Sequence, residues 1–207
     1  MRTKRFRSTV VIVLSLVLVA IAAPSGASAF SGPGPGVGAI VKKARYRAAV
    51  KLYDARWTQV KMTWEELLTY NLSLIDVCNV AEQETDPFAQ GAEWVQVAKL
   101  ANAARKRWKD LFDGNDKTLR DLGEKMQDGA DDALSPRGSI KVAKAVHLLE
   151  RAVGRLFAGT LNGSSADSEI AGKRCSEGLD RTVAAGEKFG EAQALKKRAF
   201  NLLAAAR

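Results

Sequence analysis

The two cysteines are the residues of this sequence whose chemistry is easiest to anticipate. Cys78 and Cys175 are the only cysteines in the 207-residue chain, and each lies in a segment with helical periodicity. In a protein that leaves the cytoplasm, a single pair of cysteines is typical of one disulfide. Closing a loop of about 100 residues would contribute up to about 4.7 kcal/mol by the chain-entropy model. We predict this bridge; the alternative is two unpaired thiols, one of them buried on an apolar face.

Side chains that could carry out acid–base or nucleophilic catalysis are few. The only histidine, His147, lies beside the apolar stripe of a predicted helix, where a structural role is more typical than a catalytic one. No G-x-S-x-G sequence occurs, so a serine hydrolase triad has little support. Acids on separate helices would escape a motif search, but a solvated helix face explains the candidates more simply. Those candidates are Glu65, Glu66, Asp76 and Glu82. We therefore predict that the protein is not an enzyme.

Ligands for a metal or cofactor are equally scarce. Two cysteines and one histidine do not form a spaced zinc cluster. Asp113, Asn115 and Glu124 have the spacing of positions one, three and twelve of a calcium loop. Thr118 stands where that loop needs glycine, so the end of one helix and the start of the next explain the stretch better. No glycine-rich phosphate-binding loop occurs. We predict no cofactor and no metal.

Two basic stretches could bind an anionic partner. The first runs from Lys42 to Lys61 and contains Tyr46, Tyr53 and Trp57, and the second runs over residues 99–109. The candidate surface residues are Lys42, Lys43, Arg45, Arg47, Lys51, Arg105, Lys106 and Arg107. Basic residues with aromatics can bind nucleic acid, but export argues against such a partner. An acidic protein, an anionic envelope polymer or lipid headgroups are better candidates than nucleic acid, although a solvated helix face explains the two stretches most simply.

Two N-glycosylation acceptor sequences occur, and they matter only in a eukaryotic source. Asn162 lies in a predicted loop and is the better acceptor. Asn71 lies within a predicted helix, where its match to the pattern is more easily explained as coincidence.

The N-terminus has the three-part layout of a secretory signal peptide. Four basic residues precede an apolar run from Val10 to Ala23, and the small-residue triplet Ala27-Ser28-Ala29 follows. We predict cleavage after Ala29; the alternative, a retained anchor, would be short, since a membrane span needs about 20 apolar residues. Removing residues 1–29 lowers the formal net charge from +9 to about +5, because it removes four positive charges.

The first half of the remaining chain reads as a flexible leader followed by a long helical stretch. Residues 30–37 are rich in glycine and proline. From about residue 38 to 84 the spacing is helical, with an aliphatic face formed by Val41, Ala44, Ala48, Leu52 and Ala55. Thr63 and Glu66 have the spacing of a capping box, which would start a second helix there. The sequence leaves one rod and two helices equally open.

Further helices are predicted downstream over residues 91–112 and 116–127. A loop is predicted over 128–138, followed by a helix that Ser139 caps. Asn162, Gly163, Ser164 and Ser165 are predicted to break that helix, and the last helical segment spans 166–206. Its four glycines predict bends or close helix contacts.

These patterns predict an all-α protein, because no segment shows sustained alternation typical of strands. The expected architecture is an antiparallel bundle of four to five helices over residues 38–207, elongated if 38–84 is one rod. The expected location is secreted, periplasmic or on the cell surface. The expected function is binding of a protein or other partner through a helix face. The alternative is a structural component of the cell envelope that docks to anionic polymer or lipid through the basic first helix.

Overall fold

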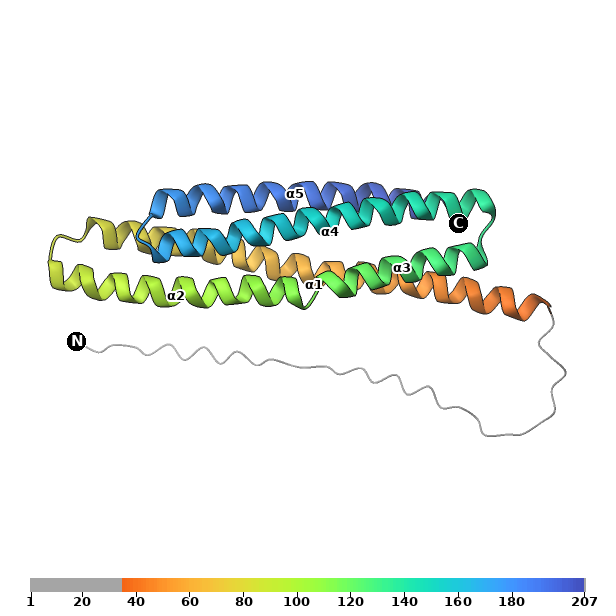
Figure 1. Ribbon diagram of the computed structural model, residues 1–207, viewed down its shortest axis with the longest axis horizontal. Helices are drawn as coiled ribbons and strands as arrows, with labels where there is room; N and C mark the ends of the chain where they lie inside the picture. Colours follow the sequence, from red (N-terminus) through yellow and green to blue (C-terminus); the bar gives the residue numbers. More distant parts are fainter. Residues whose placement is uncertain (1–34, 207) are drawn as a thin grey trace, which may run out of the picture. The chain divides into compact units, whose positions relative to one another are not determined.

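The computed structural model describes residues 35–206, and these residues form five α-helices (Figure 1). They are α1 (Pro35–Gln83), α2 (Pro87–Asp113), α3 (Asp116–Ala133), α4 (Pro136–Ala171) and α5 (Cys175–Ala205). The predicted all-α class is confirmed for this part of the chain. The predicted signal peptide lies outside it, as does the leader as far as residue 34. None of the described helices is long and apolar enough to cross a membrane.

The bundle is antiparallel, as predicted: α1 and α4 run in one direction, and α2, α3 and α5 run in the other (Figure 1). The chain returns along α1 through α2 and then α3, which lie end to end and share one position in the bundle. Then α4 runs back, and α5 returns along α4, the most extensive helix pair in the structure. Both α1 and α4 pack against all four of the other helices, so these two long helices together organise the bundle.

One continuous helix covers the stretch that the sequence left open. The Thr63 hydroxyl donates a hydrogen bond to the Gln59 carbonyl oxygen (3.2 Å), which is a bond typical of a helix interior. The predicted capping box is therefore wrong, and Glu66 instead pairs with Arg107 on α2 (3.4 Å). The reason is tertiary. A buried face continues without interruption through Tyr53, Trp57, Val60, Trp64 and Leu67, and packing of this face overrides the local start signal.

The predicted loop over 128–138 is also wrong, because α3 continues to Ala133 and α4 begins at Pro136. Gly129 is part of α3, and a Cβ there would lie 3.1 Å from the Cα of Tyr46, so this glycine permits close packing on α1. The cap of α4 is Ser135, whose hydroxyl accepts a hydrogen bond from the Gly138 amide (3.2 Å). Ser139, the predicted cap, bonds instead to the carboxylate of Asp131.

The predicted break at residues 162–165 does not occur, and α4 continues to Ala171. The chain turns at Gly172 to Arg174, where Lys173 has a φ of 64°. Gly159 and Gly163, one turn apart on α4, face the rings of Trp64 and Trp108. These two rings meet edge to face with centroids 4.8 Å apart. The glycines therefore make room for tryptophans of α1 and α2 and do not end the helix.

We expect Gly163→Ala to lower the free energy of unfolding by about 1–3 kcal/mol, the usual cost of overpacking a core. The new methyl carbon would lie 2.5 Å from Cε2 of Trp108, and that ring is fully buried. The control is Gly154→Ala on the same helix, where no atom lies within 4 Å of the added carbon. That change should stabilise by up to about 1 kcal/mol through helix propensity. Urea unfolding of both variants tests the difference; equal midpoints would contradict it.

The core has two parts. The larger cluster includes residues from all five helices and contains most of the buried aromatic rings. The smaller one lies where α1 and α2 meet the connection between α4 and α5, and it includes Trp94, Val97 and Ile170. Cys78 and Cys175 belong to this smaller cluster and form a disulfide, with their Cα atoms 5.7 Å apart. The predicted bridge is confirmed, and it joins α1 to the first residue of α5.

Candidate functional site

The aliphatic face predicted on the first helix points outward. We call Val41, Ala44, Ala48, Leu52 and Ala55 the α1 stripe, and all five are exposed. The opposite face, with Tyr46, Tyr53 and Trp57, is the buried one. Large rings remove far more apolar area from water than alanines do, which favours burying the aromatic face. The sequence suggested that these aromatics share a surface with the basic residues around them. They do not, because the aromatics belong to the core.

Cations lie on both sides of the α1 stripe. By helical spacing, Arg45 lies on the side toward α3, while Arg47 and Lys51 lie on the other side. Lys43, Arg45, Arg47 and Lys51 are exposed and form no ion pair with any other residue of the described chain. The fifth predicted residue, Lys42, pairs with Asp132 of α3 (3.3 Å). An apolar strip between two rows of largely uncompensated positive charge thus faces solvent.

A groove between α1 and α3 borders the stripe. It encloses about 380 Å³, with an apolar floor that includes Ala48, Leu52 and Leu122. Its rim carries Lys42, Arg45 and Lys125 together with the acids Asp128 and Asp132. The first turns of α1 extend past the α3–α4 connection, so this end of the helix is accessible (Figure 1). We call the α1 stripe, its flanking cations and this groove the α1 face.

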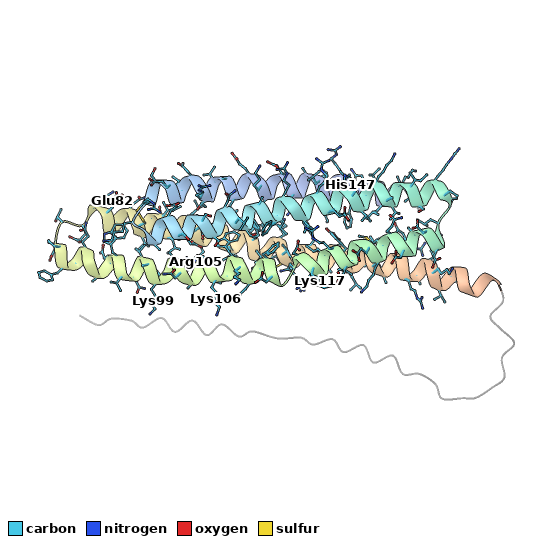
Figure 2. The ribbon with its side chains drawn as sticks, in the orientation of Figure 1. Glu82, Lys99, Arg105, Lys106, Lys117 and His147 are labelled. Atoms are coloured by element: carbon cyan, nitrogen blue, oxygen red, sulfur yellow. A yellow bond between two sulfur atoms is a disulfide. The ribbon has the colours of Figure 1, made fainter. Side chains whose placement is uncertain are left out.

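The second basic group lies elsewhere on the bundle. Arg105, Lys106 and Arg107 are exposed on α2, and Figure 2 shows Lys99 and Lys106 projecting away from its outer side. The ion pair of Arg107 with Glu66 places this group beside the middle of α1. Lys51 lies 15 residues before Glu66, or roughly 22 Å along the helix axis. The structure therefore does not join the eight predicted residues into one surface.

An acidic, partly apolar end was not anticipated from the sequence. Where α1 turns into α2, the exposed apolar side chains are Val77, Val80, Phe88 and Val95, and Phe88 is 91% exposed. The acids around them are Asp76, Glu82, Glu84, Asp86 and Glu93. We call these nine residues the hairpin tip; it extends past the α4–α5 connection (Figure 1). The signal was present in the sequence, since residues 62–98 contain seven acids and no lysine, arginine or histidine.

A buried polar cluster was also missed. Asn71, Trp108 and Asp167 meet between α1, α2 and α4, and all are at most 1% exposed. In one orientation of the Asn71 amide, its nitrogen donates to the Gly163 carbonyl (3.3 Å) and its oxygen accepts from the Trp108 ring N–H (3.4 Å). In the other, the nitrogen donates to the Leu67 carbonyl and to Oδ1 of Asp167, each 3.2 Å away. Burial places the cluster out of reach of a dissolved ligand.

Burial raises the pKa of the Asp167 carboxyl to about 8, and the positive charge of Arg105 acts in the opposite direction. Oδ2 of this carboxyl has no hydrogen-bond partner among the described residues. At neutral pH the group is therefore largely protonated, which is what desolvation of a carboxylate predicts.

The remaining candidates for chemistry are dispersed over the surface. His147 is exposed and lies 3.8 Å from Glu150 of the same helix. Glu65 pairs with Lys61, and the other candidate acids of α1 are exposed as well. Within residues 35–206, no three His, Cys, Asp or Glu side chains are grouped so as to hold a metal ion.

The two glycosylation acceptors both lie inside helices. Asn71 is fully buried, in agreement with its predicted position within a helix. Asn162 is half-buried in α4, so the predicted loop around it is wrong.

Comparison of the chain with protein-family models, with curated proteins and with solved structures finds no match.

Proposed function

We propose that the protein is an exported, non-enzymatic helical-bundle protein that binds a partner through the α1 face. The single observation that supports this most strongly is the outward α1 stripe, flanked on both sides by cations without ion pairs. Exposed apolar area contributes to binding when a partner covers it, by about 25 cal/mol for each Å² removed from water. The flanking charges select a partner with acidic groups beside an apolar strip.

Two further observations support a role outside the cytoplasm. The Cys78–Cys175 disulfide is typical of proteins folded in an oxidising compartment. The sequence of residues 1–29 has the layout of a cleaved signal peptide.

A second candidate function is favoured by the arrangement of the same residues. An apolar stripe with lysine and arginine on both sides is typical of helices that lie on anionic membrane surfaces. In this alternative the protein is an envelope component that docks to anionic lipid or polymer through α1. Docking to a polymer would depend on the cations alone, whereas a protein partner or a bilayer would also cover the stripe.

Binding of the exported protein to the envelope fraction and to the secreted proteins of its source cells tests the proposal. We expect Arg47→Glu with Lys51→Glu to weaken binding by about tenfold or more, because two attractive contacts become repulsive. The matched control is Lys99→Glu with Lys106→Glu, which makes the same charge change on the outer side of α2 and should leave binding unchanged.

Equal losses in the two variants would show that only net charge matters, and no loss in either would reject the α1 face. Leu52→Ser separates the two candidates, because it removes apolar area without changing the charge. It should strongly weaken binding to a protein or bilayer, while a polymer held by charge alone should be released by salt and not by this change.

A further inference from the structure

The two ends of the bundle are complementary in charge and in apolar character. Residues 35–61 contain seven lysines and arginines and one acid, whereas residues 62–98 contain seven acids and no basic residue. Five of the seven cations of the first group lie on the α1 face, and five of the seven acids of the second lie in the hairpin tip; the other two acids, Glu65 and Glu66, pair with Lys61 and Arg107 near the middle of α1. We propose that copies of this protein associate head to tail, with the hairpin tip of one copy docked on the α1 face of the next. This inference rests on the proposed function, since it names a second copy as the partner of that face.

One copy cannot bring its own two ends together. Both groups are carried by α1, which is a single helix from Pro35 to Gln83. Lys43 and Glu82 are 39 residues apart, so they are separated by roughly 58 Å along the helix axis. Charges at that distance are screened from each other, since the Debye length is about 8 Å at physiological salt. Their complementarity can therefore be satisfied only between two molecules.

The charges at both ends are available for such a contact. Asp76 and Glu82 are exposed and form no ion pair with any residue of the described chain, as is true of Arg45, Arg47 and Lys51 on the α1 face. Figure 2 shows Glu82 near the tip, at the opposite end of α1 from the basic residues. In the groove, Asp132 already forms an ion pair with Lys42, and Asp128 lies on the rim. The attraction must therefore come mainly from the cations that flank the α1 stripe.

The apolar parts also correspond. The tip presents Phe88, Val95 and Val80, which are 91%, 73% and 59% exposed. The α1 face offers a groove of about 380 Å³ with Leu52 and Leu122 in its floor, which is enough space for an aromatic side chain. Grouped exposed apolar side chains rimmed by charge are typical of interaction sites.

The charges restrict the symmetry of the contact. A contact of tip with tip, or of face with face, would bring like charges together and repel. An antiparallel two-fold dimer would pair each tip with the face of the other copy and would stop at two copies, so the size of the wild-type assembly distinguishes it from a head-to-tail chain. A head-to-tail contact pairs unlike surfaces and leaves one free tip and one free face at the ends of each assembly. Copies would thus add in open chains unless the geometry closes them into a ring.

Complementation between two variants tests this arrangement. The tip variant is Glu82→Lys with Phe88→Ser, and the face variant is Arg45→Glu with Leu52→Ser; all four side chains are exposed, so the fold should persist. The control is Lys106→Glu with Val183→Ser, which makes the same kinds of change at exposed sites on α2 and α5. Sedimentation velocity of the disulfide-bonded, exported protein, at concentrations up to about 1 mM, measures its size.

We expect the wild type and the control to associate at low salt and to dissociate as salt is added. Each variant alone should remain monomeric. An equimolar mixture of the two should form a dimer and nothing larger. The intact tip of the face variant binds the intact face of the tip variant, and no intact surface then remains to bind a third copy.

A wild-type protein that stays monomeric throughout, or a mixture that forms no dimer, would overturn self-association. Anionic vesicles and the envelope fraction provide the second arm. If they bind the monomeric wild type and the tip variant but not the face variant, the α1 face binds a membrane or another partner. In that case only self-association is rejected, and the proposed function stands. If the face variant keeps all binding, the proposed function fails as well.

Discussion

Replacing both Cys78 and Cys175 with alanine is expected to lower the free energy of unfolding by about 4 kcal/mol, near the chain-entropy value for a loop of this length. The bridge spans 97 residues and joins α1 to the start of α5 within the smaller core cluster. Since native domains are stable by about 5–15 kcal/mol in total, this loss is large. Urea unfolding, followed by circular dichroism, should show a much lower midpoint.

The reduced wild-type protein is the control, because it keeps both sulfur atoms in the core and loses only the cross-link. We expect its unfolding midpoint to fall close to that of the double variant. A reduced wild type as stable as the oxidised protein would show that packing, and not the link, holds this end together. Hydrogen exchange should detect the change first around residues 74–97, which contribute most of the smaller cluster around the bridge.

The buried carboxyl of Asp167 should make the protein less stable as pH rises from about 4 to about 8. Its pKa is about 8 in the folded state, against 3.8 for an exposed aspartate, so the folded state binds more protons between these values. Stability from this group is complete below the lower value and is lost as pH rises through the higher one. A pKa difference of this size corresponds to at most roughly 5–6 kcal/mol.

Asp167→Asn should remove this dependence, because the amide is neutral at every pH and has nearly the same shape. Unfolding by urea between pH 5 and pH 9 should give a nearly flat profile for the variant and a falling one for the wild type. Asp180→Asn, at an exposed site on α5, is the control and should follow the wild type. Parallel profiles for wild type and Asp167→Asn would contradict the raised pKa.

Other carboxyls should not obscure this measurement. A hydrogen bond from Ser139 lowers the pKa of Asp131, and one from Lys188 lowers the pKa of Glu191. Groups whose pKa is lowered contribute stability above their unfolded pKa and lose it only in acid. Their effect therefore lies below the pH range of the experiment.

The class of the fold and its cross-link could be predicted because both depend on short-range pattern or on simple counting. Helical spacing of apolar residues marks helices wherever they pack, and two cysteines leave only one intramolecular pairing. The turn at Asp113 to Asn115 is predictable because it also depends on a local signal. As that signal indicates, α2 ends at Asp113. The acidic character of residues 62–98 is equally visible in the sequence, but only the fold places five of its seven acids at one end of the bundle.

Helix ends and breaks were less predictable, because tertiary packing changes the meaning of the same residues. Gly163 stands in a sequence typical of a loop, yet it is helical because Trp108 occupies the space that a side chain would fill. Thr63 and Glu66 have the spacing of a helix start, yet the buried face of α1 continues across them. Local signals of about 1 kcal/mol cannot compete with the burial of several large rings.

By itself the sequence determined that the chain forms helices, that they can pair antiparallel and that one disulfide can brace them. Only the tertiary structure decided which face of α1 is buried. That helix has both an aliphatic stripe and an aromatic face, and either satisfies the periodicity of an amphipathic helix. The rings of Trp57 and Trp64 fit against α4 and α5, and this leaves the stripe and its cations facing solvent. The choice depends on the shapes of neighbouring helices, which are distant in the sequence, so no local pattern could make it.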